Sequence, residues 1–141
     1  MKMLGAVLIG VLSCATAVAQ DGGITIWHKG VPPGGIQQKV DFGDHLLEIS
    51  HREATGRAEL HKIKDDVIVI QSGAATLLTG GEVIDPKDTA PNEIQGSGIK
   101  GGVENEVGPG DIVNIPAGTP HQFLLAPGTQ ITYLVVKVIK H

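Results

Sequence analysis

The sequence is poor in cysteine and in aromatic residues. Its 141 residues include one Cys, one Trp, one Tyr and two Phe. A single cysteine cannot form a disulfide within the chain, which excludes a fold held together by such bonds. Because aromatic residues make up only 3% of the chain, the core must consist mainly of Val, Ile and Leu, and these residues favour β-strands.

Positive charge and helical periodicity are also scarce. Lys and Arg number 11 against 15 Asp and Glu, and the formal net charge is −4. This balance gives no reason to expect a nucleic acid or an anionic membrane surface as partner. No stretch of useful length has the apolar spacing of an amphipathic helix. A chain of 141 residues is too short for two ordinary domains, so we expect one.

The longest apolar run lies at the N-terminus. Residues 4–12 are apolar, follow Lys2, and precede the small-x-small sequence Ala17-Val18-Ala19. This pattern predicts a secretory signal peptide over residues 1–19, because the run is too short to remain as a membrane span. The mature domain, residues 20–141, would then be secreted or periplasmic, with no integral membrane span. The alternative is lipoprotein processing, which would leave the protein lipid-anchored through Cys14.

Glycine and proline are abundant, and they divide the rest of the chain into short β-rich runs. Twenty Gly and eight Pro are typical of many short strands joined by tight turns. So many short strands in a chain of this size predict an all-β sandwich or small barrel. The expected strands cover residues 24–27, 45–51, 57–63, 67–71, 75–79, 112–115, 122–125 and 129–139.

The segment from Gly108 to Phe123 is the most informative part of the chain. Gly-Pro-Gly-Asp at 108–111 predicts a turn, and a short strand over 112–115 follows it. The sequence Pro-Ala-Gly-Thr-Pro at 116–120 predicts a second tight bend, which places His121 at the start of the next strand. A neutral imidazole held this rigidly is a good metal ligand, although an ordinary surface histidine beside a turn is the alternative.

This segment resembles the second motif of the cupin superfamily. In that motif a Gly is followed after five residues by Pro-x-Gly, and after two more by His. Gly110, Pro116, Gly118 and His121 match these spacings, whereas the final Asn of the motif falls on Leu125. The resemblance implies an all-β, cupin-like, double-sheet jelly-roll β-barrel, and it selects this architecture among the sandwiches and barrels.

The first cupin motif, His-x-His-x4-Glu-x6-Gly, is present in altered form. Counting back from Gly73 puts Asp66 at the Glu position, His61 at the second His position and Glu59 at the first. Glu59 and His61 are two residues apart on one strand, so they face the same side. With His121 they form a candidate metal site, and Asp66 either completes it or acts through water or on another ligand. Imidazoles with carboxylates suit divalent Fe, Mn, Ni or Zn.

Four further residues are candidate substrate contacts. Phe123 shares the face of His121 and is expected to line the pocket or to belong to the core. Residues 85–106 are polar and rich in Gly and Pro, and they predict a long loop between the motifs. This loop would cover the barrel mouth with Gln95 and Lys100, or form a solvated insertion. His51 is expected either to offer a third imidazole or to lie at a sheet edge.

These observations favour an exported cupin that binds a small molecule and a divalent metal. If it is an enzyme, the resemblance implies a metal-dependent reaction of the dioxygenase or isomerase type on an oxygen-rich substrate. The alternative is a non-catalytic module that binds a sugar or an organic acid without metal. A homodimer is a further expectation, since the strand at 24–27 could extend the sheet of a partner.

Overall fold

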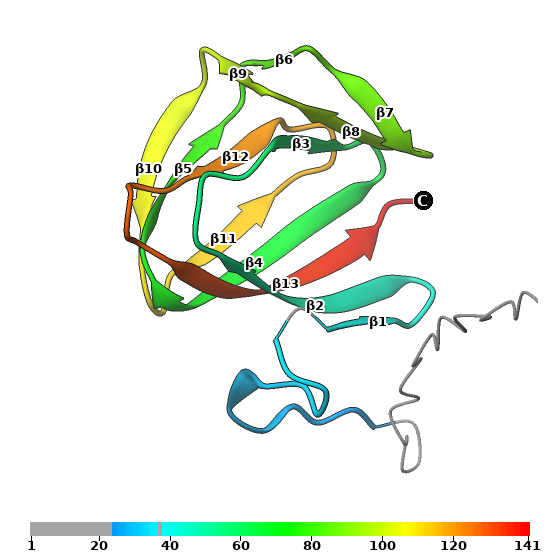
Figure 1. The fold of residues 1–141 in the computed structure, drawn as a ribbon. Coiled ribbons are helices and arrows are strands. Elements are labelled where there is room, and N and C mark those ends of the chain that lie inside the picture. The colour runs from blue at the N-terminus through cyan, green and yellow to red at the C-terminus, as the bar shows by residue number, and fades with distance from the viewer. Residues whose placement is uncertain (1–23, 37) are drawn as a thin grey trace, which may run out of the picture.

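The computed structural model describes residues 24–36 and 38–141. The predicted signal peptide and Cys14 lie outside the described residues. The regular structure is almost entirely β-strand, and two large sheets face each other across a common interior (Figure 1). The strands are β1 (Lys39–Asp41), β2 (His45–Arg52), β3 (Ala58–His61), β4 (Lys64–Gly73), β5 (Ala75–Thr79), β6 (Glu82–Ile84), β7 (Lys87–Ala90), β8 (Glu93–Gly96), β9 (Gly98–Lys100), β10 (Val103–Val107), β11 (Ile112–Ile115), β12 (His121–Leu124) and β13 (Ile131–Ile139).

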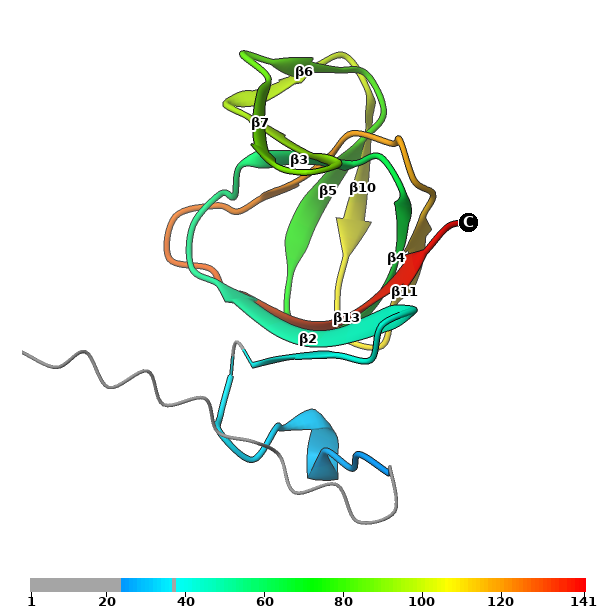
Figure 2. The ribbon, with the colours of Figure 1, turned by 90° about the vertical axis from the view of Figure 1, so that its right-hand side faces the viewer.

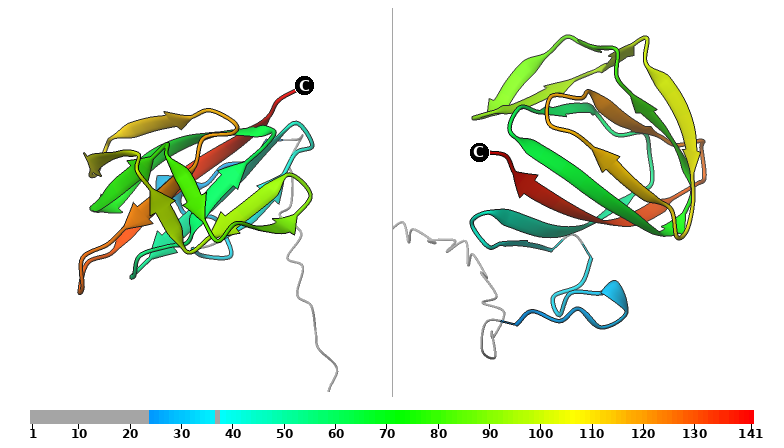
Figure 3. Two further views of the ribbon diagram at one scale, coloured as in Figure 1. Left: turned by 90° about the horizontal axis from the view of Figure 1, so that it is seen from above. Right: turned by 180° about the vertical axis from the view of Figure 1, so that it is seen from behind.

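In each large sheet, strands that are far apart in the sequence lie next to each other. One sheet has the order β1-β2-β13-β4-β11 and the other the order β10-β5-β12-β3-β8-β7, while β6 and β9 form a small separate ribbon. The views in Figures 2 and 3 show the two large sheets curving around one interior. The predicted double-sheet jelly-roll barrel is therefore confirmed.

The apolar core lies between the two sheets and consists mainly of Ile, Leu and Val, as the scarcity of aromatics predicts. Ile68 and Ile70 on β4, Leu77 on β5 and Ile131 on β13 are almost completely buried. Successive side chains of a strand point to opposite faces, so the inward face of β4 continues from Ile70 and Ile68 to Asp66. Strand β4 therefore runs from the apolar core into a polar region of the interior.

Most predicted strands are present. Strands β5 and β11 have the predicted bounds, and the runs at 45–51, 57–63, 67–71, 122–125 and 129–139 correspond to β2, β3, β4, β12 and β13 within a few residues.

The prediction of a strand at 24–27 is wrong. Ile24 makes only an isolated bridge, and the chain then enters the 3-10 turn η1 (His28–Gly30). Ile24 and Ile26 are 65% and 62% exposed, so these side chains bury too little surface to stabilise a strand, despite their β-propensity. This segment lies outside the barrel on the side of β1 and β2 (Figures 1 and 2). Among the described residues, no helix is long and apolar enough to cross a membrane.

The prediction of a loop over residues 85–106 is also wrong. This segment contains β7, β8, β9 and β10, of which β8 pairs with β3 and β10 with β5. Strands β7 and β10 lie at the two edges of their sheet, and most of their side chains are exposed. Each of these edge strands pairs its backbone with one neighbour and exposes its polar side chains to solvent, which explains why the composition resembled that of a loop.

Gly73, at the end of β4, provides a test of the packing between β4 and β13. Its φ is +75°, and a Cβ atom at this position would lie 1.9 Å from the carbonyl oxygen of Gln130. We expect Gly73→Ala to lower the free energy of unfolding by about 2–4 kcal/mol, measured by urea denaturation. The positive φ strains an alanine, and the clash of its Cβ atom with Gln130 adds to this cost.

Gly128→Ala is the matched control. Gly128 has nearly the same φ, +77°, but a Cβ atom there meets nothing within 4 Å. Its expected loss is about 1 kcal/mol, from backbone conformation alone. Equal losses in the two variants would contradict the proposed clash.

Candidate metal centre

Three donor side chains converge between the sheets. Glu59, His61 and His121 each offer one ligand atom, and these atoms lie within 4.8 Å of one another. The pairing of β3 with β12 explains this, because it places His121 directly opposite Glu59. The Oε2 atom of Glu59 is 3.9 Å from Nε2 of His61 and 3.8 Å from Nε2 of His121.

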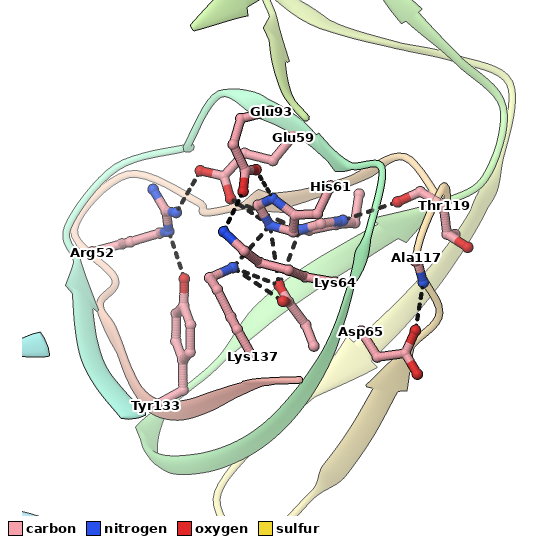
Figure 4. Close-up of polar contacts among 12 residues, drawn as sticks. Arg52, Glu59, His61, Lys64, Asp65, Glu93, Ala117, Thr119, Tyr133 and Lys137 are labelled. Atoms are coloured by element: carbon pink, nitrogen blue, oxygen red, sulfur yellow. Dashed lines mark hydrogen bonds and ion pairs between the residues drawn. The ribbon is translucent and has the colours of Figure 1, made fainter. Parts of the chain in front are cut away.

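Glu59 is held by the side chain of Arg52. The Arg52 Nη2 group donates to Oε1 of Glu59 at 3.4 Å, while its Nε group donates to the hydroxyl of Tyr133 at 3.0 Å. This leaves Oε2 as the oxygen of Glu59 nearest the two imidazoles (Figure 4). Arg52 therefore orients the carboxylate and balances its charge.

His61 is held by Glu93, its cross-strand neighbour on β8. Nδ1 of His61 donates to Oε2 of Glu93, and the Lys64 ammonium donates to Oε1 of the same carboxylate at 2.8 Å. With Nδ1 anchored in this way, Nε2 of His61 faces the other donors (Figure 4). A carboxylate that accepts from the second nitrogen of a histidine fixes its tautomer and ring orientation, as in many metal sites.

His121 is held by the bend that precedes it. Its Nδ1 donates to the carbonyl oxygen of Thr119 at 3.1 Å, which leaves Nε2 with its lone pair towards Glu59. Burial lowers the pKa of His121, so the imidazole is neutral at pH 7.

The same bend is tied to the hairpin that carries His61. The Gly118 N–H donates to the carbonyl oxygen of His61 at 2.7 Å. The Ala117 N–H donates to Oδ1 of Asp65 at 2.8 Å, as Figure 4 shows. The tight bend predicted from the sequence therefore positions both histidines relative to each other.

A buried ion pair lies beside the three donors. Asp66 on β4 is 2% exposed, and the ammonium of Lys137 on β13 is 3.0 Å from each of its carboxylate oxygens. The same ammonium is 2.8 Å from Nε2 of His61. Oδ2 of Asp66 is 3.3 Å from Nε2 of His61 and 3.6 Å from Nε2 of His121, so Asp66 also faces the site.

The charges of this cluster shift its pKa values. Burial alone would raise the pKa of Asp66, but hydrogen bonding to His61 and the charge of Lys137 outweigh it and lower that pKa. Burial alone would lower the pKa of His61, but hydrogen bonds to Asp66 and Glu93 raise it, against the opposing charge of Lys137. On acidification, His61 therefore takes up a proton before His121.

These residues line a cavity of about 360 Å³ between the sheets. Phe123 lies in its apolar wall, where it stacks on Tyr133 with 4.6 Å between ring centroids. Gln95 on β8 also lines the cavity, directly across from Glu59 in the strand pairing. Lys100 is an exposed residue of β9 opposite Glu82 and is not among the lining residues.

His51 also lies away from the cavity. On β2 the residues that line it are Leu46, Glu48, Ser50 and Arg52, whereas His51 has the opposite parity. Its Nδ1 is 2.8 Å from Oγ1 of Thr132, its cross-strand neighbour on β13.

Lys137, Glu93 and Arg52 are the site residues that sequence reasoning missed. A signal for Lys137 existed, because Ile131, Tyr133, Val135 and Lys137 alternate along β13 and the first three are buried. Arg52 carried no such signal, because the residues two and four positions before it on β2 are the polar Ser50 and Glu48. Glu93 carried none, because its segment was not recognised as a strand.

Comparison with known proteins supports the fold. No protein-family model and no curated protein sequence matches this chain. Among solved structures, an uncharacterized conserved protein with a double-stranded β-helix domain from Klebsiella pneumoniae superposes with a TM-score of 0.53 at 14% identity, over 72% of this chain and 73% of that chain. The chain has the cupin fold.

Two further solved structures superpose with lower TM-scores. A cupin protein from Bacteroides fragilis is 20% identical over 70% of this chain and 68% of that chain, with a TM-score of 0.46. A polyketide cyclase from Streptomyces resistomycificus is 22% identical, also with a TM-score of 0.46, over 67% of this chain. This chain covers only 54% of the cyclase, about half its length.

Glu93 provides a test of how the site is held. We expect Glu93→Ala to weaken divalent metal binding by about 10–100-fold, measured by calorimetric titration with Mn²⁺, because His61 loses the partner that orients its ring. Glu93→Gln keeps an oxygen that can accept from Nδ1 and should lose less affinity. Wild-type affinity in a folded Glu93→Ala protein would contradict a positioning role for Glu93.

Proposed function

We propose that this protein is an exported, metal-binding cupin that holds a small, oxygen-rich anion in its barrel. One observation carries the proposal: two imidazole Nε2 atoms and one carboxylate oxygen face a common region, and each donor is held there by a neighbouring group. Such an arrangement lowers the cost of ordering the ligands around an ion.

Glu59, His61 and His121 would hold the metal in this proposal. Two histidines with one carboxylate suit Fe(II), Mn(II), Ni(II) or Zn(II), and such a set leaves coordination positions open for water or substrate. A metal bound there would supply Lewis-acid chemistry to an oxygen of the ligand. Dioxygenase and isomerase reactions are both compatible with this donor set, and Asp66 stands beside it as a further oxygen donor or a hydrogen-bond acceptor.

The charges of the cavity favour an anionic ligand. Its lining contains three ion pairs, Arg52 with Glu59, Lys64 with Glu93 and Lys137 with Asp66, and Lys39 lies opposite Glu48 across β1 and β2. Arg57 also lines the cavity, and within residues 24–36 and 38–141 it makes no ion pair. A planar guanidinium in this position suits a carboxylate on the ligand.

A metal-free binding protein is the second candidate function. The observation that favours it is the Lys137 ammonium, which already contacts Nε2 of His61 and both oxygens of Asp66. In this alternative Lys137 and Arg57 would supply the positive charge for an organic acid, or Lys137 would donate hydrogen bonds to a sugar.

Export is proposed from the signal-like residues 1–19, with lipid anchoring at Cys14 as the alternative. A homodimer likewise stays a prediction, although the strand at 24–27 on which it was based is not formed.

Metal analysis tests the first proposal. Protein purified from its native compartment, or supplemented with Mn²⁺, Fe²⁺, Ni²⁺ or Zn²⁺ and dialysed, should carry about one ion per chain by mass spectrometry. His61→Ala and His121→Ala should each reduce this content at least about tenfold, because each removes a directly bonded donor.

His45→Ala is the control for these variants, since His45 is a surface histidine that contacts Asp44 away from the cavity. Absence of metal from the supplemented wild-type protein would refute the proposal. So would equal metal content in the wild-type protein and in both site variants.

Arg57 tests the charge of the ligand. Small dicarboxylates such as succinate should bind, and the neutral diamide succinamide should bind much more weakly. Arg57→Met should weaken succinate binding by about 10-fold or more, since a charge-assisted hydrogen bond is lost. Lys62→Met is the control, because Lys62 pairs with Asp88 outside the cavity. Equal binding of succinate and succinamide would show that the anion proposal is wrong.

A further inference from the structure

The ammonium of Lys137 lies among the donor atoms of the candidate metal centre. It is 2.8 Å from Nε2 of His61 and 3.0 Å from Oδ1 and Oδ2 of Asp66 (Figure 4). Nε2 of His61 is also one of the atoms that converge with Glu59 and His121. An ammonium that donates to this nitrogen uses the lone pair that a metal would need.

The fold itself puts Lys137 in this place. Lys137 is the cross-strand partner of Asp66 in the pairing of β13 with β4, and it follows the buried residues Tyr133 and Val135 on one face of β13. Its side chain is 14% exposed, so the ammonium is held inside the barrel rather than in solvent.

Lys140, the residue that follows β13, offers a contrast. It forms an ion pair of 2.7 Å with Asp65, the sequence neighbour of Asp66, but its side chain is 59% exposed. The two lysines therefore pair with adjacent carboxylates, one inside the barrel and one outside. Only the inner pair touches a donor atom of the candidate metal centre.

We propose that Lys137 is a built-in competitor for the metal, so that the site holds either the lysine ammonium or a divalent ion. This inference rests on the proposed metal-binding function. A dication bound by Glu59, His61 and His121 would be repelled by an ammonium at this distance, so the ammonium must leave Nε2 of His61 before the metal binds. Lys137 thereby lowers the affinity for metal and makes it exchangeable. In the absence of metal, the ammonium keeps the buried Asp66 carboxylate paired.

Calorimetric titration of the purified protein with Mn²⁺ tests this competition. Lys137→Met keeps the length and apolar stem of the side chain but removes the ammonium. We expect it to bind Mn²⁺ at least about tenfold more tightly than the wild-type protein. Lys140→Met removes the same charge from the outer pair and should change the affinity by less than about threefold.

Lys137→Met leaves Asp66 as a buried carboxylate without its cation and could therefore misfold. A second pair of variants removes the Asp66 charge and tests the same competition. Asp66→Asn with Lys137→Met should bind Mn²⁺ about tenfold more tightly than Asp66→Asn alone. Without metal, Lys137→Met should also melt at a lower temperature than the wild-type protein. Mn²⁺ should raise its melting temperature by more than it raises that of the wild-type protein.

The outcomes separate this inference from the proposed function. If the wild-type protein binds Mn²⁺ and the removal of Lys137 does not tighten binding in either background, the competition is refuted and the metal site stands. If the wild-type protein binds none but Lys137→Met does, Lys137 blocks the site: its competition with the metal is supported, and the proposed metal-binding function of the wild-type protein is refuted. If no variant binds Mn²⁺ or the other three metals, both proposals fall together.

Discussion

The antiparallel pairing of β3 with β12 is the constraint on which the site depends. It sets His121 opposite Glu59, and the strand alternation of β3 then brings His61 to the same face. Two hydrogen bonds tie the bend before β12 to the hairpin of β3 and β4: the Gly118 N–H donates to the carbonyl oxygen of His61, and the Ala117 N–H donates to the carboxylate of Asp65. A shift of one residue in this register would turn His121 away from Glu59, because side chains alternate with a period of two.

Buried charge is the second constraint, because an unpaired ion inside a barrel is costly. Three of the four carboxylates that line the cavity are paired with a cation: Glu59 with Arg52, Glu93 with Lys64, and Asp66 with Lys137. Two of these pairs also orient a candidate metal ligand. The third places a cation next to the donors. The Lys137–Asp66 pair, which keeps a buried carboxylate from being left without a cation, would therefore oppose the binding of a second cation.

The charges that line the cavity also favour an anionic ligand. Arg57 shares a lining face with Glu59 and His61, yet among the described residues it pairs with no carboxylate of the chain. Both proposals depend on the charges that line the cavity. A metal would compete with Lys137 beside Asp66, and an anion would bind Arg57, which lies just before β3.

Much of the fold could be predicted from residues that are close together in the sequence. Turn residues at 108–111 and 116–120 and the β-branched runs beside them predicted β11, β12 and the position of His121 at the start of a strand. The spacing of Glu59, His61, Asp66 and Gly73 indicated side chains that the structure does bring near His121. These features depend on backbone preferences within a few residues, which a sequence displays directly.

Other features were decided only by tertiary structure. Residues 85–106 form strands because β3 and β5 each have an edge not paired with β12, which β8 and β10 occupy, and their polar side chains carry no strand signal of their own. Residues 24–27 have that signal but lack a buried partner, so no strand forms there. The sequence by itself determined a β-barrel with histidines and carboxylates at motif spacing. The packing of two sheets decided that Lys137, Arg52 and Glu93 join them, because contacts between distant strands depend on register and not on proximity along the chain.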